Sequence, residues 1–176
     1  MKRVSVVGIS GSGKSTLAAA LADRLGVPHI ELDSLHHQAD WTPRPADELR
    51  ELVAERLDAS GWVCDGNYSA VQPIVWAGAD TVVWLDLPRR TVMRQVILRT
   101  LRRVITRKEL WNGNRETWRN AFLEKESIIR WAWTHHPKTR ARYAAAIGDP
   151  QWTSLDFVRL SSRTEIERFL HTIDRP

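Results

Sequence analysis

Cysteine is almost absent from this sequence: Cys64 is the only one among 176 residues. A single cysteine excludes any disulfide within the chain, which argues against a small disulfide-stabilised secreted domain and favours a reducing compartment. The surrounding stretch "GWVCDGN" is typical of a buried strand, so we interpret Cys64 as a small core residue.

Long apolar runs are absent as well. No stretch reaches the about 18 apolar residues that a membrane-spanning helix needs. The chain enters a strand-like run at once, without the charged and apolar regions of a secretory signal. We therefore expect a cytoplasmic protein with no membrane partner. With 43% hydrophobic and 27% charged residues, its 176 residues suit one domain with a filled core.

Acidic side chains are missing from residues 89–108, "RRTVMRQVILRTLRRVITRK", which carry eight cationic ones. Much of the formal net charge of +5 at pH 7 is therefore local, and it favours an anionic ligand. The stretch has no broad aromatic side of its own for a lipid surface, and no aromatic residues lie between its arginines for base stacking. Small-molecule phosphates are thus favoured over a membrane or DNA.

Strand-like and helix-like segments alternate along the chain. The strand-like runs are β-branched or apolar, and they cover residues 3–10, 28–32, 62–66, 80–87 and 155–160. Helical periodicity covers residues 14–25, 46–60, a long segment from Pro88, 115–134, 137–147 and 164–171. The alternation predicts an α/β fold, with a parallel sheet of five strands and helices on both faces.

The stretch "GISGSGKST" contains the phosphate-binding loop pattern of a P-loop NTPase. Its glycines let successive backbone N–H groups point at phosphate oxygens, and the following helix adds its positive end. We expect Lys14 to contact the β- and γ-phosphates of ATP and the Ser15 hydroxyl to ligate Mg²⁺. The expected phosphate-binding residues are Gly8, Gly11, Ser12, Gly13, Lys14, Ser15 and Thr16.

Carboxylates follow the strand-like runs, where ligands sit in open parallel sheets. Asp65 is the candidate second Mg²⁺ ligand, because a hard cation prefers carboxylate oxygen; the alternative is a turn-forming Asp-Gly pair. Asp33 is the candidate for accepting a proton from an acceptor hydroxyl or holding that hydroxyl, unless it only caps the next turn. We interpret Asp86 as a helix N-cap. The pairs His36–His37 and His135–His136 lack metal-ligand spacing and are interpreted as polar loop residues.

The sequence resembles the adenylate-kinase-like branch of P-loop kinases and, more narrowly, bacterial DNA topology modulation proteins. The stretches that carry the resemblance are "GISGSGKSTLAAALADRLGVPHIELDSL", "WVCDGNYS", "VVWLDLPR", "LWNGNRE" and "FVRLSS". The first is shared by P-loop kinases in general, whereas "DGNYS" and "GNRE" point to the subfamily.

The resemblance implies a five-stranded parallel sheet, a small acceptor-binding insertion at about 34–60 and an Arg-rich lid at about 104–118. It places Asp33 where related small-molecule kinases hold the acceptor, and Ser162, with its neighbours, in a loop against adenine; a plain surface loop is the alternative. Nucleotide monophosphate kinases continue the Asp-Gly after strand three with Phe-Pro-Arg. Here residues 67–69 are "NYS", which argues against AMP as the acceptor.

The predicted function is ATP- and Mg²⁺-dependent transfer of a phosphoryl group to a small acceptor. The alternative is a nucleotide-binding regulator with weak hydrolysis that contacts DNA. The predicted catalytic residues are Lys14, Asp33, Arg102 and Arg115, with Arg119 on the nucleotide. Arg44 is a further candidate on the acceptor side, unless it is a solvated surface arginine.

Residues 89–108 are predicted to form a helix that leads into this lid. We expect its buried side to comprise Met93, Val96, Ile97 and Leu101. The arginines expected close to one face are Arg94, Arg99, Arg102 and Arg103. The turn "NGN" would follow, with Arg115 and Arg119 beginning a return helix. Arginines converging from two helices fit a cover that closes on a triphosphate, whereas the alternative is a solvated basic helix.

Overall fold

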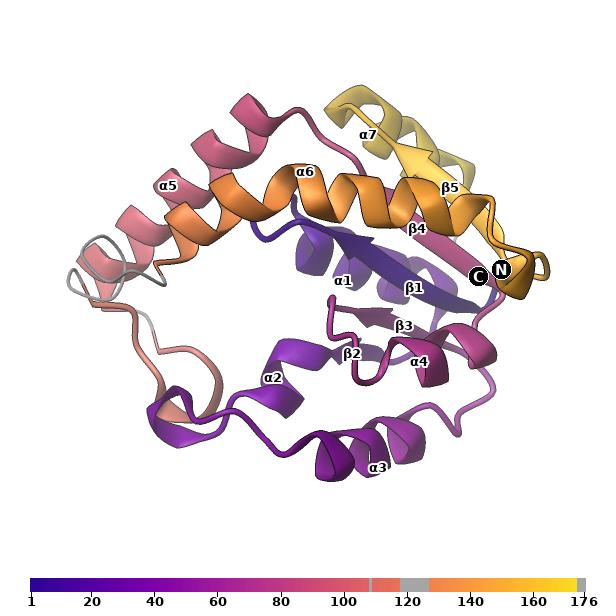
Figure 1. Cartoon of the computed structure of the whole chain (residues 1–176), viewed down its shortest axis with the longest axis horizontal. Coiled ribbons are helices and arrows are strands. Elements are labelled where there is room, and N and C mark those ends of the chain that lie inside the picture. Colours follow the sequence, from indigo (N-terminus) through magenta and orange to yellow (C-terminus); the bar gives the residue numbers. More distant parts are fainter. Residues whose placement is uncertain (108, 118–126, 174–176) are drawn as a thin grey trace.

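A five-stranded, wholly parallel sheet forms the centre of the computed structural model, which describes residues 1–107, 109–117 and 127–173 (Figure 1). The strands lie in the order β2-β3-β1-β4-β5. They are β1 (Arg3–Gly8), β2 (His29–Glu31), β3 (Trp62–Asp65), β4 (Thr81–Leu85) and β5 (Asp156–Leu160). The α/β fold predicted from the sequence is therefore confirmed, with all five strand-like runs in the sheet.

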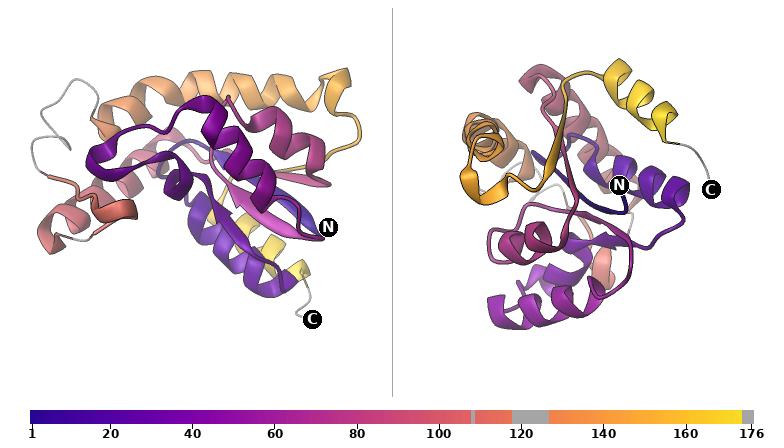
Figure 2. Two further views of the ribbon diagram at one scale, coloured as in Figure 1. Left: turned by 90° about the horizontal axis from the view of Figure 1, so that it is seen from below. Right: turned by 90° about the vertical axis from the view of Figure 1, so that its right-hand side faces the viewer.

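Both faces of the sheet are covered by helices (Figure 2). On one face, Val63 and Val83 pack with apolar residues of α1 (Lys14–Leu25) and α7 (Arg163–Thr172). On the other face, Trp62 and Trp84 pack with α3 (Ala46–Arg56), α4 (Gln72–Gly78) and α6 (Ile128–Ile147). Adjacent strand residues point to opposite faces, which explains why these strands read as unbroken apolar runs. Cys64 is buried in the second core, as predicted.

The basic stretch forms α5 (Arg89–Thr106), which begins after Pro88 as expected. Its buried residues are Val92, Val96, Thr100 and Val104. Of the four residues that we expected to be buried, only Val96 is; Ile97 is exposed. The buried side repeats every four residues and includes a threonine, whose hydroxyl hid the apolar pattern. Neither α5 nor any other helix in the described ranges is long and apolar enough to cross a membrane.

Helix α6 runs without interruption through Pro137, where we expected two helices separated by His135 and His136. A proline inside a helix removes the N–H that would bond the carbonyl four residues earlier. Here that carbonyl belongs to Trp133, and Arg89 of α5 donates to it from Nη2 at 2.6 Å. The Arg89 guanidinium also lies 3.4 Å from the centre of the Trp133 ring. A side chain from a neighbouring helix thus satisfies the carbonyl left free by Pro137.

Two tight turns meet at one end of the molecule. Helix α2 (Leu32–His36) leads into the turn η1 (Ala39–Trp41), and α5 leads through an antiparallel bridge between Glu109 and Arg115 into η2 (Trp111–Gly113). Asn114 joins the turns: its Oδ1 accepts from the Trp41 N–H at 2.8 Å, and its Nδ2 donates to the Gln38 carbonyl at 2.8 Å. The predicted insertion and lid segments are therefore in contact.

The return helix predicted to begin at Arg115 does not form there, because Arg115 is extended in the bridge to Glu109. The described part of the return begins at Ser127, whose side chain caps α6 by accepting from the Arg130 N–H. Residues 118–126, including Arg119, lie outside the described residues.

Candidate active site

The loop between β1 and α1 curls at the carboxyl end of the sheet. Gly11 has a φ of 82°, and a Cβ built on it would lie 2.0 Å from Cγ2 of Val96 on α5. Gly13, with a φ of 96°, directly precedes α1. Such positive φ angles are costly for other residues, and the loop packs directly against α5, so glycine at position 11 serves both backbone shape and close approach.

Lys14 lies at the centre of the site. Its Nζ donates to the Ile9 carbonyl at 3.3 Å. Burial lowers the pKa of this ammonium, whereas the nearby carboxylates of Asp33 and Asp65 favour its charged form. The Ser12 hydroxyl of the same loop is buried without a hydrogen-bond partner among the described residues. A cation and an unpaired hydroxyl in one glycine-rich loop suit phosphate oxygens.

Ser15 and Asp65 come together from α1 and the end of β3. The Ser15 hydroxyl donates to Asp65 Oδ2 at 2.8 Å, and His29 Nε2 lies 2.7 Å from Asp65 Oδ1. The hydrogen bond with Asp65 raises the pKa of His29. Mg²⁺ takes one or two protein oxygens and completes its shell with water and substrate phosphates. The hydroxyl–carboxylate pair fits that ion, although no larger cluster of metal-ligating side chains occurs in the described residues.

We expect Asp65→Asn to raise the Mg²⁺ concentration needed for nucleotide binding by about tenfold or more, because an amide is a weaker ligand for a hard cation. Titration of Mg²⁺ at fixed ATP, followed by calorimetry, measures the change. Asp23→Asn, an exposed position on α1, is the control. Identical Mg²⁺ curves for Asp65→Asn and wild type would remove Asp65 from the metal site.

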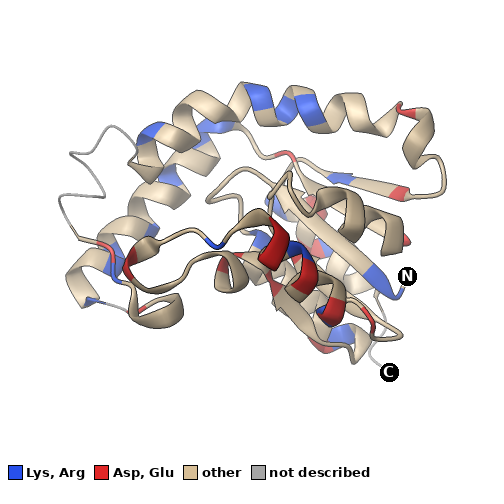
Figure 3. Ribbon diagram, turned by 60° about the horizontal axis from the view of Figure 1, so that its bottom comes forward, with Lys and Arg blue, Asp and Glu red and all other residues tan. Residues whose placement is uncertain are grey.

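A cleft of about 830 Å³ runs from the phosphate loop along α5. Arg94, Arg99 and Arg103 of α5 line it, together with Arg163 of α7. Figure 3 shows the basic residues of α5 as bands along that helix. The cleft thus combines the phosphate loop with arginines from two helices, an arrangement suited to a polyanion such as a triphosphate.

Arg99 is the arginine most closely tied to the phosphate loop. Its Nη2 donates to Ser10 Oγ at 3.5 Å, and its Nε is buried without a partner among the described residues. Burial and the neighbouring charge of Arg103 lower the pKa of Arg99. Arg103 in turn pairs with Glu116 at 2.9 Å. A buried donor without a partner costs free energy, and an anion bound in the cleft would accept from Arg99 and remove that cost.

The structure does not bring the two arginines that were predicted to be catalytic, Arg102 and Arg115, to this cleft. Arg102 is exposed and does not line this cleft. Arg115 is exposed and pairs with Glu109 at 3.3 Å. Arg102 and Arg99 belonged to the same expected face, and sequence spacing alone did not separate them. The buried residues of α5 recur every four positions and include Thr100 and Val104. Arg99 and Arg103 are next to these two residues in the sequence, whereas Arg102 is not next to Thr100 or Val104.

Three further predicted residues have structural partners. Ser162 caps α7 by accepting from the Glu165 N–H, while the adjacent Arg163 lines the cleft. Arg44 donates from Nε to the Leu35 carbonyl at 2.8 Å and does not line this cleft. The N-cap assigned to Asp86 is wrong, because Pro88 holds that position in α5. Asp86 is instead buried.

The buried carboxylate of Asp86 is neutralised by two arginines. Arg159 of β5 donates from Nε at 2.9 Å, and Arg140 of α6 lies 3.2 Å away. A buried carboxylate needs such partners, because desolvation penalises an unpaired charge. This cluster ties the end of β4 to β5 and α6.

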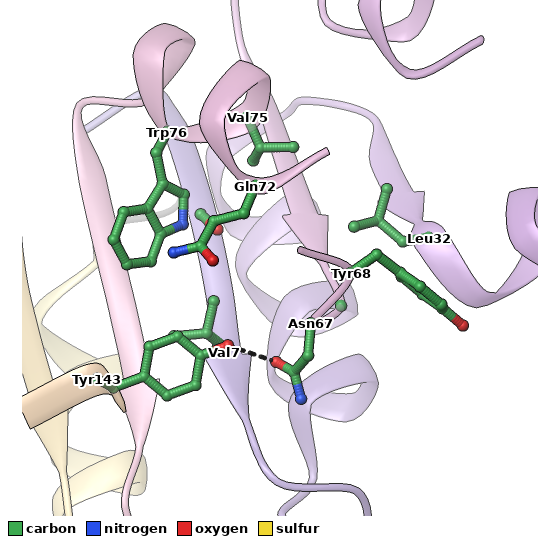
Figure 4. A pocket seen from close by; sticks show the side chains of 10 residues that line it. Val7, Leu32, Asn67, Tyr68, Gln72, Val75, Trp76 and Tyr143 are labelled. Carbon is green, nitrogen blue, oxygen red and sulfur yellow. Dashed lines mark hydrogen bonds between the residues drawn. The ribbon is translucent and has the colours of Figure 1, made fainter. Parts of the chain in front are cut away.

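A second cleft, of about 720 Å³, shares Ser10, Lys14 and Asp33 with the first. Asp33 accepts a hydrogen bond from the Tyr68 hydroxyl at 2.7 Å. Burial and the neighbouring carboxylate of Asp33 raise the pKa of the Tyr68 phenol, which therefore remains a donor. Figure 4 shows that the two side chains after β3 point in different directions. Asn67 points toward Tyr143, whose hydroxyl donates to Asn67 Oδ1 at 2.9 Å, and Tyr68 points away from it.

His36, His135 and His136 lie in helices, contrary to the sequence interpretation, whereas His37 lies in the connection after α2. His36 lies in α2, and its ring contacts those of His37 and Tyr68 at centroid distances of 4.9 and 4.3 Å. Adjacent residues within one helix point in different directions, but α2 ends between His36 and His37, and the two rings are in contact. His136 is buried in α6 and lies 3.0 Å from the Leu87 carbonyl. His135 stacks on Trp131 and lines the second cleft.

Comparison with known proteins finds kinases that are similar to this chain. It is 26% identical over 141 residues to a shikimate kinase of Synechococcus elongatus, covering 67% of this chain and 73% of that protein. It is 34% identical over 86 residues to adenylate kinase 1 of Nostoc sp., covering 38% of this chain and 47% of that protein. No family model matches.

A solved kinase structure also has a fold similar to that of this chain. The crystal structure of a shikimate kinase from Bacteroides thetaiotaomicron aligns with a TM-score of 0.55 and 15% identity, over 97% of this chain and 95% of that one. The sequence relatives support the adenylate-kinase-like P-loop kinases as the class, and the structure supports the P-loop fold. The narrower resemblance to DNA topology modulation proteins is not confirmed by these matches and stays a prediction.

Proposed function

We propose that this protein is an ATP- and Mg²⁺-dependent phosphotransferase that phosphorylates a small acceptor. The observation that carries the proposal is that two clefts meet at Lys14 and Asp33. One cleft contains the phosphate loop and the arginines of α5, and the other contains the Asp33–Tyr68 pair. A donor and an acceptor would therefore face each other across one lysine and one carboxylate.

The reaction needs little covalent chemistry from the protein. The acceptor oxygen forms a bond to the γ-phosphorus, the bond from that phosphorus to the β–γ bridging oxygen breaks, and ADP leaves with the electron pair. Asp33 takes the proton from the acceptor hydroxyl and releases it to solvent. Lys14 and Arg99 hold and neutralise the phosphate oxygens. Mg²⁺ bound by Ser15 and Asp65 would supply further positive charge to those oxygens.

We expect Asp33→Asn to lower kcat by about 10²-fold or more while ATP affinity changes little, because the amide cannot accept the proton. ATP binding is measured by calorimetry. Turnover is measured with an acceptor found by screening metabolites for ATP consumption, with products identified by mass spectrometry. Asp40→Asn, an exposed change in η1, is the control. Equal kcat for Asp33→Asn and wild type would exclude Asp33 as the base.

The same screen tests the proposed function itself. A phosphorylated product whose mass exceeds that of the acceptor by one phosphoryl group, formed with an equal amount of ADP, is the expected result. Release of inorganic phosphate at the same rate with and without every candidate acceptor would contradict it and favour the weakly hydrolytic regulator.

A further inference from the structure

We propose that the acceptor is a nucleoside-like molecule: a flat ring with hydrogen-bonding edges that bears an uncharged hydroxyl. This inference rests on the proposed function, because it assigns the second cleft to the acceptor. Three properties of that cleft carry it: its flat aromatic walls, its shortage of anion-binding groups and its hydrogen-bonding groups beside Lys14.

Aromatic rings line the second cleft from three parts of the chain. Trp131 and His135 of α6 lie parallel, with ring centres 4.6 Å apart and planes 13° apart. Tyr68 and His37 come from the segments after β3 and α2. Flat rings offer stacking surfaces that tolerate different ring ligands, whereas a linear polyol gains little from them. The volume of about 720 Å³ leaves room for a ring together with a sugar.

The charges of the second cleft do not suit a phosphorylated acceptor. Among the described residues that line it, Lys14 and Arg130 are the cations; Lys14 also faces the donor cleft, and the Arg130 side chain is exposed. Burial lowers the pKa of His37, which favours the neutral ring. Asp33 adds a negative charge at the point where donor and acceptor would meet. A second phosphate there would be repelled by this carboxylate.

Hydrogen-bonding groups remain available for a neutral ligand. The hydrogen bond from Tyr68 occupies Oδ1 of Asp33, and no other described residue is bonded to its Oδ2, which can accept from a substrate hydroxyl. Nδ1 of His37 is buried without a partner among the described residues, and such an orphan is costly unless a ligand satisfies it. The polar edge of a nucleobase offers both donors and acceptors. A single neutral ligand can therefore stack, pair its edge and present a hydroxyl to Asp33.

Calorimetry with matched ligands tests this inference. Adenosine, uridine, their 5′-monophosphates, ribose and glycerol are each titrated into the protein, with and without a non-hydrolysable ATP analogue and Mg²⁺. We expect at least one nucleoside to bind about tenfold or more tightly than its own monophosphate and than ribose. Tighter binding of the monophosphates, equal binding of ribose or glycerol, or no binding of either nucleoside overturns the inference.

Two tryptophans of α6 provide a matched pair of variants. Trp131 lines the second cleft, whereas Trp133, two residues further on, is exposed and stacks on Arg89. We expect Trp131→Leu to weaken nucleoside binding about tenfold or more and Trp133→Leu to leave it unchanged. Equal effects of both variants, or no effect of Trp131→Leu in a protein that still melts cooperatively, would remove the stacking site.

The two proposals fail in different ways. If the ATP analogue does not bind, the proposed kinase function fails, and nucleoside titrations without the analogue still decide the ring site. If ATP is consumed with an acyclic or phosphorylated acceptor and the nucleosides do not bind, the kinase stands and the acceptor class is wrong.

Discussion

Lys14→Ala is expected to lower kcat for phosphoryl transfer by on the order of 10³-fold, because it removes the cation that we propose contacts the β- and γ-phosphates. The loss should appear in ATP affinity as well, since the lysine binds the ground state of the triphosphate. Stability should change little. Within the part of the chain that the structure describes, Lys14 makes one hydrogen bond, to the Ile9 carbonyl at 3.3 Å, and burial lowers its pKa, so its charge contributes little to the stability of the fold.

ATP binding by calorimetry, ADP release and thermal melting together check this expectation. Lys2→Ala removes an exposed lysine of the same charge from the other end of β1 and serves as the control. A Lys14→Ala protein that binds and turns over ATP as the wild type does would show that the loop is a structural turn only. A large drop in Tm would show instead that the lysine stabilises the fold.

Arg99→Ala is expected to have a comparable effect, a loss of about 10³-fold or more in kcat, because a guanidinium that neutralises the transferred group contributes on that scale. The reason is structural: Arg99 donates a hydrogen bond to Ser10 of the phosphate loop, and its buried Nε has no partner in the residues that the structure describes. Removing it leaves the buried stripe of α5 untouched, because that stripe consists of Val92, Val96, Thr100 and Val104.

Arg102→Ala and Arg115→Ala are the matched comparisons for Arg99→Ala. Both side chains are exposed, so we expect smaller losses, measured as kcat with the same acceptor. A loss as large as that of Arg99→Ala in either variant would restore the catalytic role that the sequence predicts for it. Binding of duplex DNA is measured in parallel over a range of salt concentrations. Lost DNA binding with full transfer activity in all three variants would favour the DNA-contacting regulator.

The parts of the fold that sequence predicted well depend on local chemistry. The phosphate loop and its helix follow from glycine conformations and one lysine, and the five strands follow from short β-branched runs. The Ser15–Asp65 pair was predicted because both residues end up at the same edge of a parallel sheet.

The parts that sequence missed depend on contacts between distant segments. Pro137 was read as a helix start because the donor that rescues its free carbonyl, Arg89, is remote in sequence. The buried side of α5 was misplaced because Thr100 interrupts the apolar pattern. The aromatic wall at Trp131 and His135 could not be seen until α6 was known to be one continuous helix.

The contact between Gly11 and Val96 has a consequence for how relatives of this chain can diverge. A Cβ at position 11 would lie 2.0 Å from Cγ2 of Val96, so a larger residue at position 11 requires a smaller one at position 96 or a displaced α5. The two positions are 85 residues apart in the sequence and are expected to change together. Relatives that have valine at position 96 are therefore expected to have glycine at position 11. Substitutions in the phosphate loop therefore depend on the residues of α5, the helix that carries Arg94, Arg99 and Arg103.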